Sequence, residues 1–250
     1  MILAFTNQKG GVGKTTSALN TGVYLANMGK KVLLVDVDPQ ANLTSGIGHE
    51  NTNQGSGTYE LLTDKTSISK SFYSTKIPNL YIVPSSIDLA GAEVELVSAM
   101  NRERILANAL DEIKDDFDYI MIDCPPSLGL LTLNALTAAD GAIIPVQCEY
   151  FALEGLGQLI NTIKLVKKNL NPALSIKGVI LTMFDSRTNL SKEIVDEVKA
   201  FFKDKVFDTI VPRNVRLSEA PSHGDPISTY DPKSPGALAY QKLAKEIIED

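Results

Sequence analysis

Residues that could bind a polyphosphate stand together near the N-terminus. They lie between a short apolar run and a segment of helical period, in the order Lys9, Gly10, Gly11, Val12, Gly13, Lys14, Thr15 and Thr16. Glycines let backbone N–H groups turn inward around phosphate oxygens, and the N-terminus of the next helix attracts the same negative charge. In such a loop Lys14 reaches the terminal phosphates and Thr15 ligates Mg²⁺. The pattern predicts a loop that binds a nucleoside triphosphate with magnesium.

The entrance of this loop departs from the usual pattern. Gln8 stands where the first glycine of the pattern would be, and Lys9 adds a second lysine. Since Lys14 serves the phosphates of its own nucleotide, Lys9 is available for a phosphate group bound by a second copy of the chain. A solvated surface lysine is the alternative that spacing alone leaves open.

Two further segments place carboxylates where the loop could use them. Asp36 and Asp38 follow an apolar run, and Asp123 ends the run Ile120–Asp123. Ligands of doubly wound sheets bind at the carboxyl ends of the strands. We expect Asp38 to orient the attacking water or accept its proton, and Asp38 and Asp123 to contact Mg²⁺ through water. For Asp36 a role as a strand-end cap is equally open.

Apolar, β-branched runs alternate with segments of helical period along the chain, which is typical of βαβ units. The expected strands are Ile2–Thr6, Lys31–Asp36, Leu80–Val83, Tyr119–Asp123, Ala142–Val146, Ile176–Leu181 and Val206–Val211. The expected helices are Lys14–Met28, Ala90–Ala99, Arg102–Lys114, Leu130–Thr137, Glu154–Lys168, Leu190–Phe202 and Gly236–Ile248, and Gly46–Thr58 is expected to be a polar loop. We therefore predict one α/β domain over residues 1–250. Its fold is that of a P-loop NTPase, a doubly wound, mostly parallel twisted sheet with helices on both faces.

Composition narrows the class of protein. The chain has 250 residues, 44% hydrophobic and 22% charged, with two cysteines, Cys124 and Cys148. These values are typical of a globular protein and exclude a secreted disulfide scaffold. No apolar run approaches the length of a membrane span, so we expect a cytoplasmic protein without a membrane partner. The net charge is −6, yet residues 160–217 hold 11 Lys and Arg against 6 Asp and Glu.

The segment Lys9–Thr16 resembles the deviant Walker A motif, K-G-G-x-G-K-[ST], of the ParA/MinD family of dimerising ATPases. The resemblance implies that Lys9 is the signature lysine, which crosses the dimer to the partner's ATP, and that Gly11 lies where the two nucleotides face each other. It also implies that Asp38, in D-x-D-P-Q, is the hydrolytic residue. Together these imply a slow ATPase, active with Mg²⁺, that forms a homodimer when ATP is bound.

The segment Val211–Arg216 bears on the base that is bound. No N-K-x-D motif of guanine-binding proteins occurs, which favours ATP. The segment is similar to the P-R-N stretch that contacts adenine in the ParA/MinD family, so the resemblance makes Pro212 and Asn214 the base-binding candidates. Without the resemblance, a plain polar loop is the alternative.

The segments around Arg187 and Arg216 are similar to the shorter, chromosomal-type ParA proteins of the Soj type. The resemblance implies that both arginines bind double-stranded DNA without sequence preference once two subunits join, and that the protein is nucleoid-associated. It implies a ParB/Spo0J-type partner that stimulates hydrolysis during chromosome or plasmid segregation, and a DnaA-type replication initiator as a second candidate partner. Solvated surface charges are the alternative for both arginines.

Other functions share parts of these patterns. A MinD-like positioning ATPase acting on a surface other than DNA is the main alternative, but a membrane-binding tail would be basic and amphipathic, whereas the last residues here are acidic. An iron protein would use Cys124 and Cys148 to bind a cluster shared between two subunits. We interpret both cysteines as buried apolar residues instead. A metabolic ligase would leave Lys9 unexplained, and a binding module would leave Asp38 idle.

Overall fold

The computed structural model describes residues 1–49, 56–150, 152–153 and 155–249. Its strands form one sheet in the order β3-β4-β2-β5-β1-β6-β7-β8, parallel throughout except for β3. The strands are β1 (Ile2–Phe5), β2 (Val32–Asp36), β3 (Tyr73–Ser74), β4 (Leu80–Val83), β5 (Tyr119–Asp123), β6 (Gly141–Gln147), β7 (Ser175–Phe184) and β8 (Val206–Pro212). The predicted doubly wound, mostly parallel sheet is thus confirmed.

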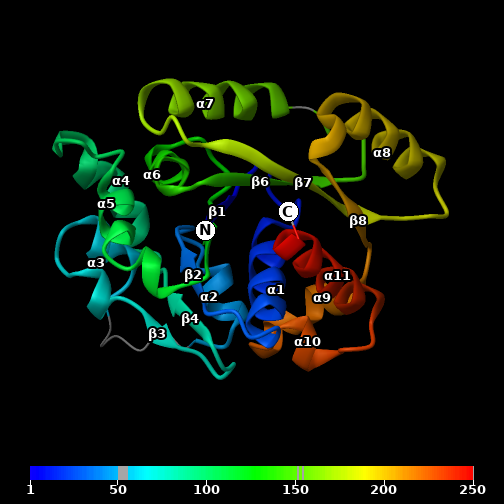
Figure 1. The fold of residues 1–250 in the computed structure, drawn as a ribbon, viewed down its shortest axis with the longest axis horizontal. Helices are drawn as coiled ribbons and strands as arrows, with labels where there is room; N and C mark the ends of the chain where they lie inside the picture. The colour runs from blue at the N-terminus through cyan, green and yellow to red at the C-terminus, as the bar shows by residue number, and fades with distance from the viewer. Residues whose placement is uncertain (50–55, 151, 154, 250) are drawn as a thin grey trace.

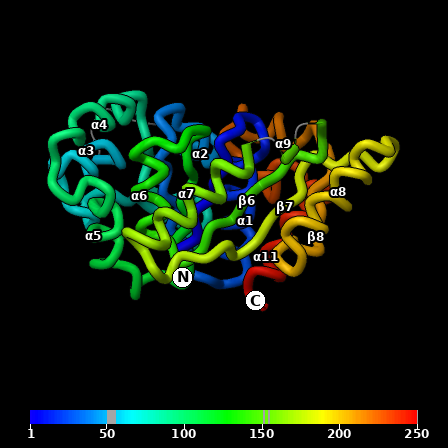
Figure 2. Tube along the Cα trace, turned by 90° about the horizontal axis from the view of Figure 1, so that it is seen from above, coloured from blue at the N-terminus to red at the C-terminus, as the bar shows by residue number. Residues whose placement is uncertain are grey.

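Helices cover both faces of the sheet (Figure 1). One face carries α3 (Thr58–Leu62), α4 (Leu89–Glu95), α5 (Ile105–Asp111), α6 (Leu130–Ala138), α7 (Leu156–Asn169) and α8 (Asn189–Phe202). The other carries α1 (Lys14–Asn27), α2 (Asn42–Gly46), α9 (Val215–Glu219), α10 (Ile227–Tyr230) and α11 (Pro235–Glu249). Seen from above, α7 and α8 lie over the strands while α1 and α11 lie beneath them (Figure 2). The sheet is therefore the middle of three layers.

The alternation of side chains along β5 shows how the sequence builds these layers. Ile120 and Ile122 belong to the core on the α4–α8 face, whereas Tyr119 and Met121 belong to the core on the α1–α11 face. Successive side chains of a strand point to opposite faces, so a strand covered on both sides must be apolar at every position.

No described helix is long and apolar enough to span a membrane.

Differences from the predicted elements lie mainly in short segments. The helix expected over Arg102–Lys114 is the shorter α5, and β3, α2, α3, α9 and α10 were not predicted. Helices of four or five residues contain too few turns to show an apolar period in the sequence. Their formation depends on tertiary contacts instead. The predicted polar loop Gly46–Thr58 joins α2 to α3, and its residues 50–55 lie outside the described residues, as does Glu154 at the predicted start of α7.

The strand order creates a switch point beside β1. The chain leaves β1 for β2 on one side of it, whereas the connection after β5 crosses to β6 on the other side. In open α/β sheets, ligands bind outside the carboxyl ends of the strands at such a point. The phosphate loop after β1 and the carboxylates at the ends of β2 and β5 meet there, as Asp36 pairs with Asp123 in register.

Candidate nucleotide-binding site

The phosphate loop joins β1 to α1 and is held by two hydrogen bonds in addition to the conformation of its glycines. Gly11 and Gly13 have φ of +73° and +89°, in the left-handed region that glycine tolerates best. Thr182 Oγ1 donates to the Val12 carbonyl over 2.8 Å, and the Lys9 N–H donates to Asn7 Oδ1 over 3.0 Å. The fixed loop can therefore present its N–H groups to phosphate oxygens.

Lys14 is the cation at the centre of the site. Its side chain is buried, and its ammonium donates to the Lys9 carbonyl over 3.3 Å. Burial lowers the pKa of Lys14, while the negative charges of Asp123 and Asp38 oppose that shift. Phosphate oxygens would add the negative charge that a buried ammonium lacks, so the environment of Lys14 suits a polyphosphate.

Asp123 ends β5 beside the loop and is fully buried. Neither of its carboxylate oxygens has a hydrogen-bond partner among the described residues. Burial and the charge of Asp36 raise the pKa of Asp123, while the nearby Thr15 hydroxyl and the Lys14 ammonium act in the opposite direction. A buried carboxylate without partners is costly, and a hard cation with oxygen ligands would relieve that cost. Asp123, Thr15 and Asp38 therefore form an oxygen donor set that fits Mg²⁺.

The two carboxylates after β2 occupy different environments. Asp36 is fully buried and accepts from the Asp38 N–H (3.1 Å), the Thr44 N–H (2.9 Å) and Thr44 Oγ1 (2.7 Å). Burial raises the pKa of Asp36 to about 6, against these hydrogen bonds. Asp36 thus holds the start of α2 in place, as the cap interpretation requires. Asp38 accepts from the Gln40 N–H over 2.9 Å and lines the pocket beside Lys14.

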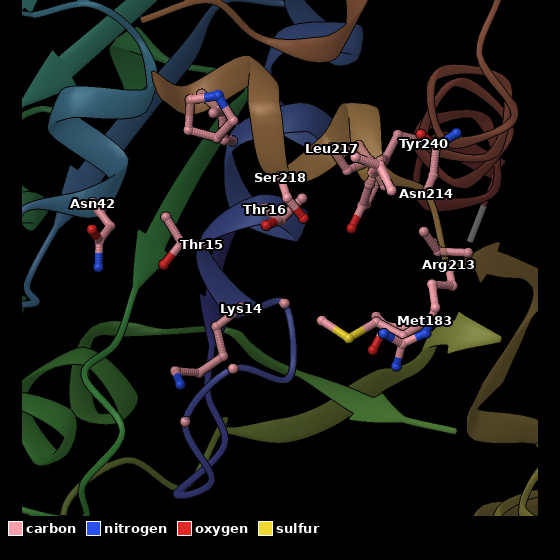
Figure 3. A pocket seen from close by; sticks show the side chains of 18 of the residues that line it. Lys14, Thr15, Thr16, Asn42, Met183, Arg213, Asn214, Leu217, Ser218 and Tyr240 are labelled. Carbon is pink, nitrogen blue, oxygen red and sulfur yellow. The ribbon is translucent and has the colours of Figure 1, made fainter. Parts of the chain in front are cut away.

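A pocket of about 710 Å³ extends from the phosphate loop to the segment after β8. Figure 3 shows Lys14, Thr15 and Thr16 at one end, and Met183, Arg213, Asn214 and Tyr240 at the other. Asn214 caps α9, where its side-chain oxygen accepts from the Arg216 N–H over 2.8 Å. The pocket therefore brings the predicted phosphate residues Gly10, Gly11, Gly13, Lys14, Thr15, Thr16 and Asp38 together with the predicted base residues Pro212 and Asn214.

Sequence reasoning missed several residues of this pocket. Asn42 and Ser45 come from α2, Ser218 from α9, and Tyr240 from α11. Tyr240 is buried and shares a hydrogen bond of 3.0 Å with Ser17 of α1, and burial raises its pKa to about 12. A buried tyrosine 223 positions from its partner has no local sequence signal. The sequence predicts only that it lies within the helix expected over Gly236–Ile248.

Lys9 lies outside this pocket. It lines a second hollow of about 840 Å³, together with Gln8, Pro126, Ser127, Leu128, Gly155, Gly157 and Gln158. Pro126 lines both hollows, so they adjoin at the segment after Asp123. A side chain at Gly155, whose φ is +79°, would overlap the Gln8 amide, so Gln8 fills the position that this glycine leaves open. The two lysines of the loop thus stand in different hollows.

The two predicted DNA-binding arginines lie on the surface, each beside carboxylates of the same chain. The Arg187 side chain is 84% exposed and donates twice to Asp185, over 2.9 and 2.7 Å. These hydrogen bonds lower the pKa of Asp185 to about 2. Arg216 on α9 is 55% exposed and lies 2.9 Å from Glu219 and 3.6 Å from Asp231. Neither arginine is among the pocket residues.

The two cysteines are both free and buried. Burial raises the pKa of Cys148 to about 12 and raises that of Cys124 further. Such thiols remain protonated and pack as small apolar groups.

Comparisons with known proteins agree with this geometry. Residues 1–176 match the family described as AAA domain. The chain is 58% identical to the sporulation initiation inhibitor protein Soj of Bacillus subtilis, over 98% of this chain and 97% of that protein. It is also 53% identical to the chromosome partitioning protein ParA of Myxococcus xanthus, over 99% of this chain and 88% of that protein.

A solved structure adds the ligands. Cobyrinic acid a,c-diamide synthase of Mycobacterium smegmatis, solved with ADP and magnesium, superposes with a TM-score of 0.87 at 39% identity, over 99% of this chain and 94% of that one. The same synthase, solved with an ATP analogue and magnesium, superposes equally well, so the predicted ATP and Mg²⁺ are confirmed as the ligands of this class of site. The chain belongs to the Soj/ParA family of chromosome-partitioning ATPases.

Proposed function

We propose that this ATPase acts in DNA segregation through an ATP-dependent homodimer. In the ATP-bound state two chains pair face to face and hold double-stranded DNA without sequence preference. Hydrolysis returns them to monomers and releases the DNA. A ParB/Spo0J-type partner stimulates the slow hydrolysis, so that release occurs where that partner is bound.

One observation carries this proposal, namely the separation of the two loop lysines. Lys14 stands in the nucleotide pocket, whereas Lys9 lines the neighbouring hollow, which shares Pro126 with that pocket. A lysine that does not line its own pocket is free to contact a nucleotide held by another chain. Gly11 is exposed, with nothing within 4 Å of an added Cβ, which leaves room for a second phosphate loop. Both features support a shared, two-chain site.

We assign roles to the site residues on the basis of the family resemblance, and their environments support these roles. The triphosphate is held by Gly10, Gly11, Val12, Gly13, Lys14, Thr15 and Thr16, with Lys14 on its terminal oxygens. Lys9 contacts the triphosphate that the other chain holds. Thr15, and Asp123 and Asp38 through water, hold Mg²⁺, which when bound neutralises phosphate charge. Asp38 orients the attacking water and accepts its proton, since it lines the pocket and Asp36 fixes its backbone. Pro212 and Asn214 contact adenine at the far end.

DNA binding is assigned to Arg187 and Arg216, which lie in the stretch with a net charge of +5. In one chain both arginines are paired with carboxylates. DNA phosphates must compete with those carboxylates, so a single copy binds weakly. Two copies side by side double the number of phosphates neutralised, and the second contact becomes intramolecular. The dimer therefore binds DNA far more tightly than a single acidic chain does.

The proposed dimer has a second candidate protein partner, and one alternative function is also open to it. A DnaA-type replication initiator is a second candidate partner, and binding to DNA would place the protein on the nucleoid within the cytoplasm. A MinD-like positioning ATPase acting on another surface remains the alternative function. The cell division ATPase MinD of Pyrococcus furiosus has a TM-score of 0.81 at 28% identity, over 99% of this chain and 98% of that one. The higher identity to Soj favours the DNA-directed function.

A DNA-retention assay over a salt series tests the proposal. The protein is passed over immobilised duplexes of two unrelated sequences, with Mg²⁺ and ATP, ADP or no nucleotide. We expect retention only with ATP, equal on both duplexes, and falling steeply as salt rises. Equal retention in all three nucleotide states would refute ATP-dependent DNA binding. Retention on neither duplex, with intact ATP turnover, would favour the MinD-like alternative.

A further inference from the structure

Two glycines distant in sequence meet with their backbones in contact beside the nucleotide pocket. Gly48 lies just after α2, and Gly224 follows the 3₁₀ helix Ala220–His223, with φ of +68° and +67°. A Cβ at Gly48 would lie 2.6 Å from the Gly224 carbonyl oxygen, and one at Gly224 would lie 2.9 Å from the Gly48 Cα. The obstacle in both directions is backbone, which cannot rotate away as a side chain can. We call this the glycine contact.

The glycine contact joins two walls of the pocket. Asn42 and Ser45 line it from α2, and Pro221 and Ser222 line it from the 3₁₀ helix. Each glycine is fixed to its own wall by its N–H, which donates to the Ser45 carbonyl from Gly48 (2.9 Å) and to the Pro221 carbonyl from Gly224 (3.0 Å). One wall therefore cannot move toward the other at this contact without displacing it.

The α2 wall continues to Asp38 through short hydrogen bonds. The Ala41 N–H donates to the Asp38 carbonyl over 2.9 Å, and the Ser45 N–H donates to the Ala41 carbonyl over 3.0 Å. Thr44 of α2 and the Asp38 N–H share the carboxylate of Asp36. Hydrogen bonds therefore connect Asp38 to α2, at whose end Gly48 lies.

The opposite wall continues to Arg216. The His223 ring stacks on Tyr230, with centroids 5.1 Å apart and planes at 25°. The Tyr230 hydroxyl donates to Glu219 over 3.3 Å, and Glu219 pairs with Arg216. Residues 213–230 thus form an arm that holds both Asn214 and Arg216.

We propose that Gly48 and Gly224 are positioning residues that couple Asp38 to this arm. ATP differs from ADP by the γ-phosphate, whose charge lies at the Lys14 and Asp38 end of the pocket. The resulting shift of Asp38 passes through α2 and the glycine contact to the arm, because closely packed backbone transmits displacement. The inference rests on the proposed function for the roles of Asp38 and Arg216.

Amide hydrogen exchange tests the coupling without DNA. The amides of Gly224 and Asp225 donate to the Pro221 and Ala220 carbonyls and report on the arm. In the parent protein we expect these amides to exchange about tenfold more slowly with Mg²⁺ and a non-hydrolysable ATP analogue than with Mg²⁺ and ADP, within the range typical of coupled sites. In Gly224→Ala and Gly48→Ala we expect that difference to disappear while the ATP analogue still binds.

A matched control separates coupling from backbone strain. Gly29 has φ of +85° with nothing within 4 Å of an added Cβ, so Gly29→Ala carries the strain without the clash. It should keep the parental difference between the two nucleotides. Thr44→Val interrupts the same route without changing a glycine and should reduce the difference, which keeps the test decisive if both glycine variants unfold.

Two results would overturn the coupling. One is a parent protein whose Gly224 and Asp225 amides exchange equally with the ATP analogue and with ADP. The other is a folded Gly224→Ala protein, or Thr44→Val where neither glycine variant folds, that keeps the parental difference. Neither result touches the DNA-retention assay of the parent, so failure of the coupling and failure of the proposed function are distinguishable.

Discussion

Charged side chains have opposite environments in the nucleotide pocket and at the surface around Arg187 and Arg216, which we call the arginine surface. In the pocket, Lys14 and Asp123 are buried, and the Asp123 carboxylate has no hydrogen-bond partner among the described residues. At the surface, Arg187 and Arg216 are exposed and paired with carboxylates. The buried charges of the pocket therefore gain much from a single bound ligand, whereas the two surface arginines are already paired and gain less from any one phosphate. Binding in the pocket should depend on single residues, and binding at the surface on the number of residues engaged.

The strongest test of this difference is Lys14→Ala. The substitution removes the ammonium that faces the phosphates, so ATP affinity should fall about 100-fold, the scale of two charge-assisted hydrogen bonds. Titration with a fluorescent ATP analogue measures the effect. Nucleotide affinity within twofold of the parent would show that the loop does not bind phosphate as we assign it.

Asp38→Ala should separate binding from chemistry. ATP affinity should persist, turnover should fall by about 10² to 10⁴, as for loss of a general base, and the ATP-bound dimer should stay on DNA. Steady-state phosphate release and DNA retention measure both. Normal turnover would contradict the role of Asp38.

Asp36→Ala is the structural counterpart of that variant. It leaves the buried Thr44 donors and the Asp38 N–H without their acceptor, and each lost partner costs about 1–3 kcal/mol. Thermal unfolding should show a lower Tm for Asp36→Ala and a nearly parental Tm for Asp38→Ala. Equal losses of Tm in the two variants would contradict a structural role that belongs to Asp36 and not to Asp38.

Lys9→Ala tests whether the second hollow belongs to a two-chain site. ATP affinity of the single chain should stay within about threefold, while dimerisation with a non-hydrolysable analogue should weaken about 30-fold, since one charged contact is lost for each nucleotide. Analytical ultracentrifugation reports the oligomeric state. A variant that dimerises as fully as the parent would leave Lys9 as a solvated lysine.

Arg216→Ala should have a smaller effect on ligand affinity than the changes in the pocket, because several charged residues of the arginine surface contribute to DNA binding. DNA affinity should fall about fivefold to tenfold on every sequence, with the salt slope reduced by about one, and dimerisation should be unchanged. Lys114→Ala removes a similar charge outside residues 160–217 and serves as the control. An effect confined to one duplex sequence would argue for base recognition.

Asp185→Asn should produce the smallest change, and in the opposite direction. The low pKa of Asp185, about 2, keeps it ionised at neutral pH, so the pair with Arg187 persists across the usual assay range. Removing the carboxylate frees Arg187, and DNA affinity should rise about threefold, the scale of an exposed ion pair. Arg187→Ala combined with Asp185→Asn should abolish the gain. An unchanged affinity would place Arg187 outside the DNA surface.

The phosphate loop and the three carboxylates were predictable because each follows a buried strand at its carboxyl end. The separate environments of Asp36 and Asp38 were not, since the acceptor role of Asp36 depends on Thr44 in α2, a helix too short to show a period. Likewise the carboxylates beside Arg216 come from the same helix and from Asp231, a contact that exists only after folding. The local sequence pattern indicated which charged residues lie at the site. Tertiary contacts determine which of them are already hydrogen-bonded or ion-paired within the chain.

The hydrogen bond between Ser17 and Tyr240 has a consequence for biosynthesis. Tyr240 belongs to α11, which is synthesised long after Ser17, yet it forms part of the pocket wall and packs on the helix that follows the phosphate loop. A nascent chain therefore cannot complete this wall of its pocket before α11 has been synthesised. Until then the phosphate loop stands without the tyrosine that packs on its helix.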